Sequence, residues 1–238
     1  MIFDLGRGGE FTHRPDASFG ARAARAAKAT PPAVGAVGAG TGARSRGLQG
    51  GVGSASITLA NGVVVAAFAV VNSAGSVLDP ATGLPWEPGS VRLRRPNAVD
   101  RAALQAYLDA AVPPLNTTIG IVATTAALTK SECSKFASVA HDGLARAIRP
   151  VHSLLDGDTI FGVATGRDDL GPLTNAAAPG EPPRRTRVGW LNAVLEAGAQ
   201  CFAAACTDAI VLASATGADL AYRDLCPSAY PRGFLSGG

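Results

Sequence analysis

The order of apolar and polar residues along the chain predicts strands in four places. Residues 54–59 alternate and residues 63–71 form a continuous apolar run, and the Asn-Gly pair between them is typical of a hairpin turn. Because the second run does not alternate, it predicts a strand that is buried on both faces. Residues 117–124 and 159–166 are two more apolar runs of strand length. We therefore expect a sheet that includes an antiparallel pair.

Helix start signals occur between these runs. A helix over 97–111 is indicated by Asn97 as its N-cap and Asp100 in its first turn. A longer helix begins where Thr129 and Glu132 have the spacing of a capping box. Apolar residues then recur at helical spacing and predict the stripe that faces the core. They are Cys133, Phe136, Ala137, Ala140, Leu144 and Ile148.

Two further segments predict helices of opposite character. Residues 17–29 place small apolar side chains and Phe19 on one helical face, with basic residues on the other. Residues 188–213 form a long apolar stretch that is interrupted at mid-span by Glu196, Gln200 and Asp208. These polar residues argue against a membrane span, so we expect a buried helix or two short ones.

Composition narrows the class of protein. The chain has 238 residues, of which 47% are hydrophobic and 16% charged, which is enough for a full core in one large domain or two small ones. Aromatic residues make up only 5%, whereas glycine occurs 29 times, so small side chains are expected to pack closely. This composition suits a sheet covered by helices.

Charge and cysteine usage exclude several kinds of partner. The net charge is +3, and the basic residues are scattered without neighbouring aromatics, so we expect no nucleic acid as partner. The four cysteines show no paired spacing, which indicates neither a metal site nor a disulfide framework. Asp4 and Arg7 lie where a secretory signal needs an apolar stretch, so we expect a cytoplasmic protein with no membrane partner.

Two familiar kinds of site fit the sequence poorly. Gly38, Gly40 and Ala43 match a loose dinucleotide pattern, but no helix can open after them and no acidic residue follows at the right distance. A serine hydrolase is disfavoured because no nucleophile-elbow motif occurs. We interpret His141 as a surface or partly buried structural residue, and His152 as a loop residue bonded to backbone.

The segment "AVPPLNTTIGIV" at 111–122 offers a third kind of site. A loop that enters a strand explains it locally, but Thr117 at the border can also become a new N-terminus. A threonine hydroxyl is a weak nucleophile until a base removes its proton, and the α-amino group of the same residue can be that base. This chemistry requires cleavage of the Asn116–Thr117 bond, with donors such as Asn72 stabilising the tetrahedral oxyanion.

Ordered blocks along nearly the whole chain carry a resemblance to a known family. They include "FDLGRGG", "VGAGTGA", "GGVGSAS", "VVNSAGSVLDP" and the region from "NTTIGIVATT" to "LLDGDTIFGVATG". In these blocks the chain resembles the DmpA-type aminopeptidases, which comprise L-aminopeptidase/D-esterase, β-peptidyl aminopeptidases and nylon-oligomer hydrolases. The resemblance implies an α/β fold, a four-layer αββα sandwich of the N-terminal-nucleophile type shared with ornithine acetyltransferases. It also implies no cofactor and no metal.

Site residues follow from this resemblance at the matching positions. Thr117 is the implied nucleophile, Asn116 the residue before the self-cleavage site, and Asn72 the oxyanion donor. Asp156 and Asp158 match an acidic pair that would orient the amine, although "DGD" by itself fits a solvated turn. One domain over 1–238, cut into fragments 1–116 and 117–238, would assemble as a tetramer of processed heterodimers.

The chain also departs from the family pattern. Arg46 and Gly47 stand where the family commonly has Gly-Lys, and Phe3 stands where some relatives carry a tyrosine. The family's opening strands and first helix have no counterpart, so we expect an N-terminally truncated member. Three functions remain: an aminopeptidase acting on short peptides, amides or esters; an ornithine-acetyltransferase-like acyltransferase; and a non-catalytic relative.

Overall fold

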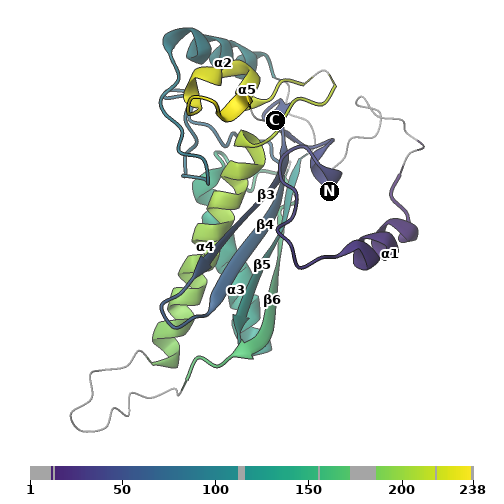
Figure 1. Ribbon diagram of the computed structural model, residues 1–238, viewed down its shortest axis with the longest axis vertical. Coiled ribbons are helices and arrows are strands. Elements are labelled where there is room, and N and C mark those ends of the chain that lie inside the picture. The colour runs from purple at the N-terminus through teal and green to yellow at the C-terminus, as the bar shows by residue number, and fades with distance from the viewer. Residues whose placement is uncertain are drawn as a thin grey trace, which may run out of the picture.

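The chain folds around a four-stranded sheet with helices on one face (Figure 1). The computed structural model describes residues 12, 14–111, 116–154, 156–171, 186–217 and 219–236. The strands follow one another across the sheet in chain order: β3 (Gly51–Thr58), β4 (Val64–Asn72), β5 (Thr117–Ala126) and β6 (Thr159–Asp168). β3, β4 and β5 are antiparallel, whereas β5 and β6 are parallel because helix α3 (Lys130–Ala147) connects them.

All four expected strands are present, with two differences. β3 begins at Gly51, before the expected residue 54. β4 was expected to be buried on both faces, but its first half alternates between buried and half-buried residues. Only its last four residues, Ala69 to Asn72, are all buried, because loops cover the sheet at that end.

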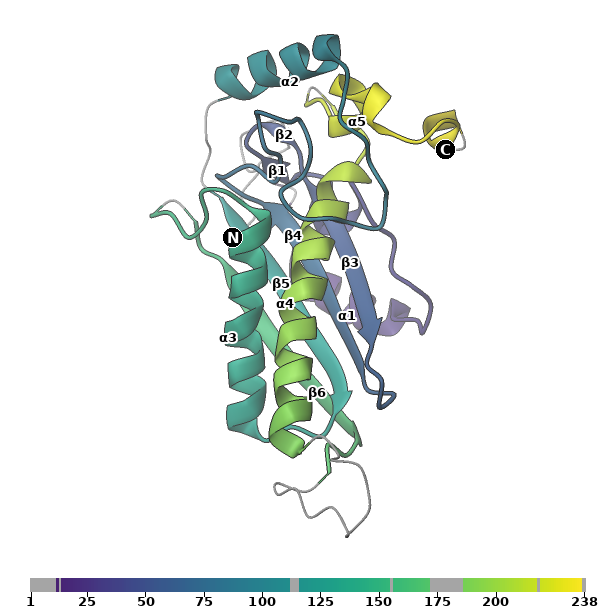
Figure 2. The same cartoon turned by 90° about the vertical axis from the view of Figure 1, so that its left-hand side faces the viewer.

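Two long helices form the layer that covers the sheet. α3 and α4 (Arg187–Val211) lie side by side on one face (Figure 2). The capping box of Thr129 and Glu132 is confirmed. In the predicted stripe of α3, Phe136, Ala140 and Leu144 are buried, whereas Cys133 and Ala137 are half-buried because they lie near the edge strand.

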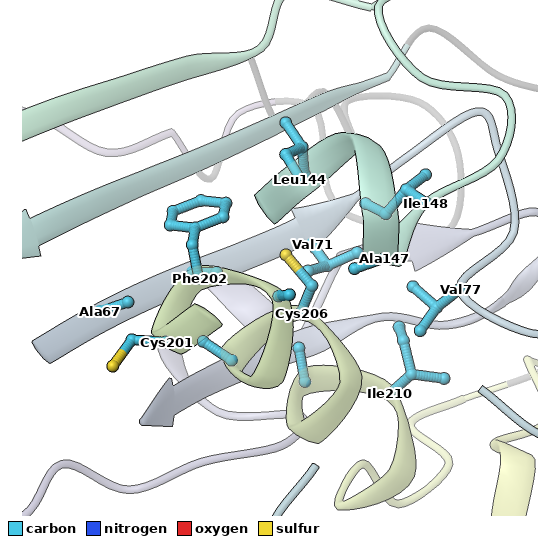
Figure 3. Close-up of a cluster of buried hydrophobic side chains, with 14 of the residues drawn as sticks. Ala67, Val71, Val77, Leu144, Ala147, Ile148, Cys201, Phe202, Cys206 and Ile210 are labelled. Atoms are coloured by element: carbon cyan, nitrogen blue, oxygen red, sulfur yellow. The ribbon is translucent and has the colours of Figure 1, made fainter. Parts of the chain in front are cut away.

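α4 is one continuous helix of 25 residues, so the alternative of two short helices is wrong. By length and composition it is apolar enough to cross a membrane, yet 78% of its most apolar window is buried inside the molecule. It therefore packs as the core helix of this fold, as the polar residues at mid-span suggested. Figure 3 shows its side chains Phe202, Cys206 and Ile210 in the core with residues of α3 and β4.

Small residues allow the layers to approach closely. A Cβ atom at Gly53 of β3 would lie 1.8 Å from the carbonyl oxygen of Ala205, and one at Gly143 would lie 2.1 Å from that of Ala199. Both carbonyls belong to α4, so only glycine lets this helix lie directly against β3 and α3. The expectation of close packing by small side chains is confirmed.

The remaining short elements gather at the end of the sheet where β4 ends and β5 begins (Figure 1). α2 (Ala98–Ala110) has the predicted N-cap, since Asn97 accepts a hydrogen bond from the Asp100 amide. The other elements there are the strands β1 (Arg44–Ser45) and β2 (Leu48–Gln49), the helix α5 (Tyr222–Leu225), and the 3-10 helices η1 (Gly38–Gly40), η2 (Pro227–Ala229) and η3 (Phe234–Ser236).

Helix α1 (Ala17–Ala26) stands apart from the sheet in Figure 1. None of its residues is buried, and Phe19 is 52% exposed beneath the guanidinium of Arg22, which lies 4.5 Å from the ring centroid. The helix is therefore present as expected, but its apolar face contacts no core.

The α/β class is confirmed. The described residues supply one helical layer and one sheet layer, half of the four layers expected. In the described part of the chain, no helix covers the other face along β5 and β6, where Ile121, Phe161 and Val163 are exposed. The sheet thus has a face covered by α3 and α4, which we call the covered face, and an opposite face, which we call the open face.

Candidate active site

Thr117 and Asn72 lie opposite each other at one end of the sheet. Asn72 is the last residue of β4 and pairs with Thr117, the first residue of β5. Side chains of directly opposed residues project from the same face of a sheet. Since Gly120 of β5 packs against Phe202 on the covered face, Thr117, which is an odd number of residues away, projects from the open face. Both residues are nevertheless buried, with exposures of 2% for Thr117 and 4% for Asn72.

The Asn72 amide is held in one orientation. Its Oδ1 accepts a hydrogen bond of 2.9 Å from the backbone N–H of Arg44 in β1. Its Nδ2 is buried and has no hydrogen-bond partner among the residues that the structure describes. Buried donors are nearly always paired, so an unpaired amide donor opposite a hydroxyl is an unusual feature that calls for an explanation.

The Thr117 hydroxyl lies directly against the peptide bond that precedes it. It donates a hydrogen bond to the carbonyl oxygen of Asn116. The same oxygen accepts the backbone N–H of Gly157 at 3.3 Å, and Asn116 forms a parallel bridge with Asp156. The Asn116–Thr117 bond is therefore held between the start of β5 and the turn at 156–158. Gly157 was not anticipated, because a backbone donor has no signature in the sequence.

Both aspartates of the "DGD" turn lie at this end of the sheet, and neither is a solvated turn residue. Asp158 accepts the backbone N–H of Thr118 at 2.8 Å through Oδ1, and its side chain is only 3% exposed. Asp156 accepts the N–H of Ala74 at 3.2 Å and the hydroxyl of Ser153 at 2.6 Å. Asp158 therefore contacts the residue after Thr117, whereas Asp156 connects the segment that follows Asn72 to the 153–158 turn.

His152 differs from its expected role. Instead of bonding to backbone, its Nδ1 lies 2.8 Å from Oδ2 of Asp158. His141 of α3 lies beside it, with the two ring centroids 5.1 Å apart. His141 is half-buried, as expected; burial and then the charge of His152 lower the pKa of His141 below its ordinary value. No sequence pattern indicated the His152–Asp158 contact, because it depends on how the loop at His152 folds against the turn six residues later.

The family departures lie beside the site or outside the described residues. Arg46 is exposed in the turn between β1 and β2, with φ at +46°, and its N–H donates to the Ser73 carbonyl. Phe3 lies outside the described residues. The segment at 38–43 forms η1 and leads into β1 rather than into a long helix, which agrees with the argument against a dinucleotide site. Within the described ranges, no group of three or more histidine, cysteine or acidic residues is arranged to hold a metal ion.

Similar solved structures define the class of fold. A β-aminopeptidase from Burkholderia sp. matches with a TM-score of 0.59 and 26% identity, covering 93% of this chain and 61% of that chain. An L-aminopeptidase D-Ala-esterase/amidase from Ochrobactrum anthropi, described as a variant of the Ntn hydrolase fold, matches with a TM-score of 0.51 and 21% identity. That match covers 77% of this chain and 46% of the other. The fold is thus that of the N-terminal-nucleophile hydrolases.

Sequence comparison narrows the class to a family. An uncharacterized aminopeptidase of Mycobacterium tuberculosis is 46% identical over 236 residues, which are 97% of this chain and 67% of that protein. The model of peptidase family S58 matches residues 3–221. The chain belongs to peptidase family S58, which confirms the resemblance to the DmpA-type aminopeptidases. It spans about two thirds of the mycobacterial relative and about three fifths of the Burkholderia enzyme.

Proposed function

We propose that the protein is an aminopeptidase that cleaves itself between Asn116 and Thr117 and then uses Thr117 as its nucleophile. The observation that carries this proposal is the contact between the Thr117 hydroxyl and the Asn116 carbonyl, opposite the unpaired amide donor of Asn72. Both groups are buried at the end of adjacent strands, so little movement is needed to bring them into use.

Self-cleavage uses groups that already surround this peptide bond. Thr117 Oγ attacks the Asn116 carbonyl carbon while its proton passes to a base, and the carbonyl oxygen becomes an oxyanion. The Gly157 N–H, 3.3 Å from that oxygen, and Nδ2 of Asn72 are the donors available to stabilise it. The C–N bond then breaks, the nitrogen takes up a proton, and Asn116 is left as an ester on Oγ. Water hydrolyses the ester and releases the Asn116 carboxylate.

Turnover repeats the same chemistry on a substrate. The new α-amino group of Thr117, with an ordinary pKa of about 8, accepts the hydroxyl proton while Oγ attacks a substrate carbonyl. The leaving amine takes that proton, and water releases the acyl group from the resulting ester. Asn72 donates to the oxyanion in both steps, and Asp158 lies close enough to the start of β5 to orient the amine.

The substrates we propose are short peptides, amino-acid amides or esters. Two similar solved structures are named as a β-aminopeptidase and as an L-aminopeptidase D-Ala-esterase/amidase, and these names cover peptide, amide and ester substrates. The second is called a prototype of serine aminopeptidases, and a threonine hydroxyl can act in the same way. We propose a homo-oligomer of processed chains as the working form, without cofactor or metal.

Intact mass under denaturing conditions tests the proposal. The purified protein should give two fragments, 1–116 and 117–238, and Thr117→Ala should remain one chain. Thr118→Val is the matched control, because it removes the neighbouring hydroxyl but keeps the N–H that bonds to Asp158; it should cleave normally. One uncut band from the parent protein would contradict self-cleavage.

Assays on the processed protein separate the aminopeptidase from the alternatives. Release of p-nitroaniline from aminoacyl p-nitroanilides, absent in Thr117→Ala, is the expected result. Transfer of the acyl group to an amine such as ornithine, instead of to water, would indicate an acyltransferase. Processed and folded protein that is inert with every such substrate would indicate a non-catalytic relative.

A further inference from the structure

A single carboxylate connects an exposed histidine to the strand that begins at Thr117. Asp158 Oδ1 accepts the N–H of Thr118 at 2.8 Å, and Asp158 Oδ2 lies 2.8 Å from Nδ1 of His152. The Asp158 side chain is 3% exposed, whereas that of His152 is 42% exposed. The aspartate is therefore buried against β5, and the histidine is its connection to solvent.

The chemistry of these groups determines where the protons lie. A backbone N–H can only donate, and an ionised carboxylate can only accept, so Nδ1 of His152 must carry a proton in order to bond to Asp158. The nitrogen left to gain or lose a proton is Nε2. Imidazole changes its charge near neutral pH. This change can occur at Nε2 without breaking the hydrogen bond that Nδ1–H donates to Asp158.

The position of His152 is held by its surroundings. Its φ is +53°, a left-handed conformation that is costly for a residue other than glycine and persists only where neighbouring contacts enforce it. One such contact lies next in the chain, where Asp156 accepts both the N–H and the hydroxyl of Ser153. The histidine is therefore not an incidental surface residue that happens to reach the carboxylate.

We propose that His152 is a positioning residue: acting through Asp158, it fixes the start of β5 and couples the charge beside Thr117 to the pH of the solvent. This inference rests on the proposed function, because it concerns the groups that surround the Thr117 nucleophile. His152 bonds to Asp158, and Asp158 accepts the Thr118 N–H, so the influence of His152 passes through these two groups.

The other titratable groups around this pair do not reproduce the effect. From α3, the His141 ring lies 5.1 Å from the His152 ring, and burial and then the charge of His152 lower the pKa of His141, while the neighbouring Asp142 acts on His141 in the opposite sense. From α4, Cys206 lies near Asp158, but burial raises the pKa of this thiol and keeps it neutral. Asp156, in the same turn as Asp158, bonds to Ser153 and Ala74 instead.

The expected sign follows from the charge of the pair. With neutral His152, the pair carries one negative charge, which favours the protonated form of a nearby Thr117 amine. With protonated His152, the pair is neutral, so the amine loses its proton more readily. Because only the neutral amine can act as base, the parent protein should keep more of its rate below neutral pH than a variant in which residue 152 cannot be protonated.

A nuclear magnetic resonance titration tests the coupling without relying on activity. In the uncleaved Thr117→Ala chain, the Thr118 amide shift should move with pH at the same midpoint as the His152 ring protons. His152→Asn in that background should flatten the Thr118 titration, whereas the control His141→Asn should leave the two midpoints equal. Asparagine keeps a donor near the Nδ1 position and tolerates a positive φ. A Thr118 amide that is insensitive to His152 would overturn the inference.

Kinetics of the processed protein then test the positioning role. His152→Ala should lower kcat about 10-fold to 100-fold with KM within about twofold, since a small misplacement of reacting groups has effects of this size. His152→Asn should restore kcat at the pH optimum but lose more rate on the acid side than the parent protein. Identical kcat values and pH profiles in all three proteins would refute positioning. If the parent protein neither cleaves itself nor hydrolyses any substrate, the proposed function fails, while the titration still decides the His152 coupling.

Discussion

The two faces of the central sheet differ in how deeply their side chains are buried. On the covered face, Val65, Ala67 and Val122 are at most 4% exposed and pack beneath α3 and α4. On the open face, Phe161 is 57% and Ile121 41% exposed. The same strands supply both faces because successive side chains point to opposite sides. The covered face therefore supplies most of the core, whereas the buried end of the open face holds the groups that we propose for catalysis.

On each face, the described residues also include a buried side-chain donor without a hydrogen-bond partner. On the covered face it is the hydroxyl of Thr118, and on the open face it is Nδ2 of Asn72. The first is a cost to stability, since an unpaired hydroxyl in an apolar core gains nothing. The second is explained if its partner is an oxyanion that exists only during the reaction. The two donors thus differ in that the proposed reaction provides a partner for Asn72 Nδ2 but not for the Thr118 hydroxyl.

The largest effect should come from the covered face. Phe202→Ala removes the ring that packs on Gly120 and leaves a cavity between α4 and β5, and should lower the free energy of unfolding by about 3–5 kcal/mol. Denaturant unfolding followed by circular dichroism measures this loss. A cost below about 1 kcal/mol would show that the helical layer is not the main source of stability.

Asn72→Ala should affect the chemistry on the open face. Loss of one oxyanion donor should slow self-cleavage and hydrolysis about 10²-fold to 10³-fold, followed as the rate of fragment formation by intact mass. Ser73→Ala is the control, because it removes a buried hydroxyl bonded to Ser45 and Gly75 that has no place in the proposed chemistry. Equal slowing by both variants would indicate a structural effect of the site rather than oxyanion stabilisation.

Asp208→Asn tests how the stability of the helical layer depends on pH. Burial raises the pKa of Asp208, whose Oδ1 accepts the Ser90 N–H at 2.7 Å. Because its pKa is higher in the folded than in the unfolded state, Asp208 stabilises the fold most at pH values below the unfolded pKa of about 3.9. This stabilisation is lost as the pH rises through the folded pKa. Asparagine keeps the acceptor without the charge.

The variant should therefore match the parent protein near pH 4 and exceed its Tm by about 2–4 °C at pH 7. Thermal unfolding at a series of pH values measures the difference. A variant that is less stable than the parent protein at pH 7 would mean that the charge itself is needed at this position.

The smallest effect should come from the exposed end of the open face. Phe161→Ala changes a side chain that is 57% exposed, and should shift the free energy of unfolding by no more than about 0.5 kcal/mol. The same denaturant measurement as for Phe202→Ala makes the two phenylalanines directly comparable. A loss as large as that of Phe202→Ala would contradict the difference between the two faces and show that another protein surface covers the open face in solution.

Local signals in the sequence predicted most of the elements but not all of their environments. The capping box at Thr129 and the N-cap at Asn97 were predictable because both depend on residues three positions apart. The exposure of α1 was not, because amphipathic spacing describes a helix and not what lies against it. Thr117 was singled out from its own segment and the "DGD" turn through the family blocks, whereas no short motif indicated the Gly157 donor or the His152–Asp158 contact.

By itself, the sequence determined most strand and helix segments and the Asn116–Thr117 border, because local patterns specify them, and it determined the family through blocks spread along the chain. Only the tertiary structure decided that Asn72 lies opposite Thr117 with an unpaired amide, and that Asp158 joins His152 to Thr118. The physical reason is that strand register and the hydrogen bonds between separate segments depend on how the layers and loops pack together, which no local pattern specifies.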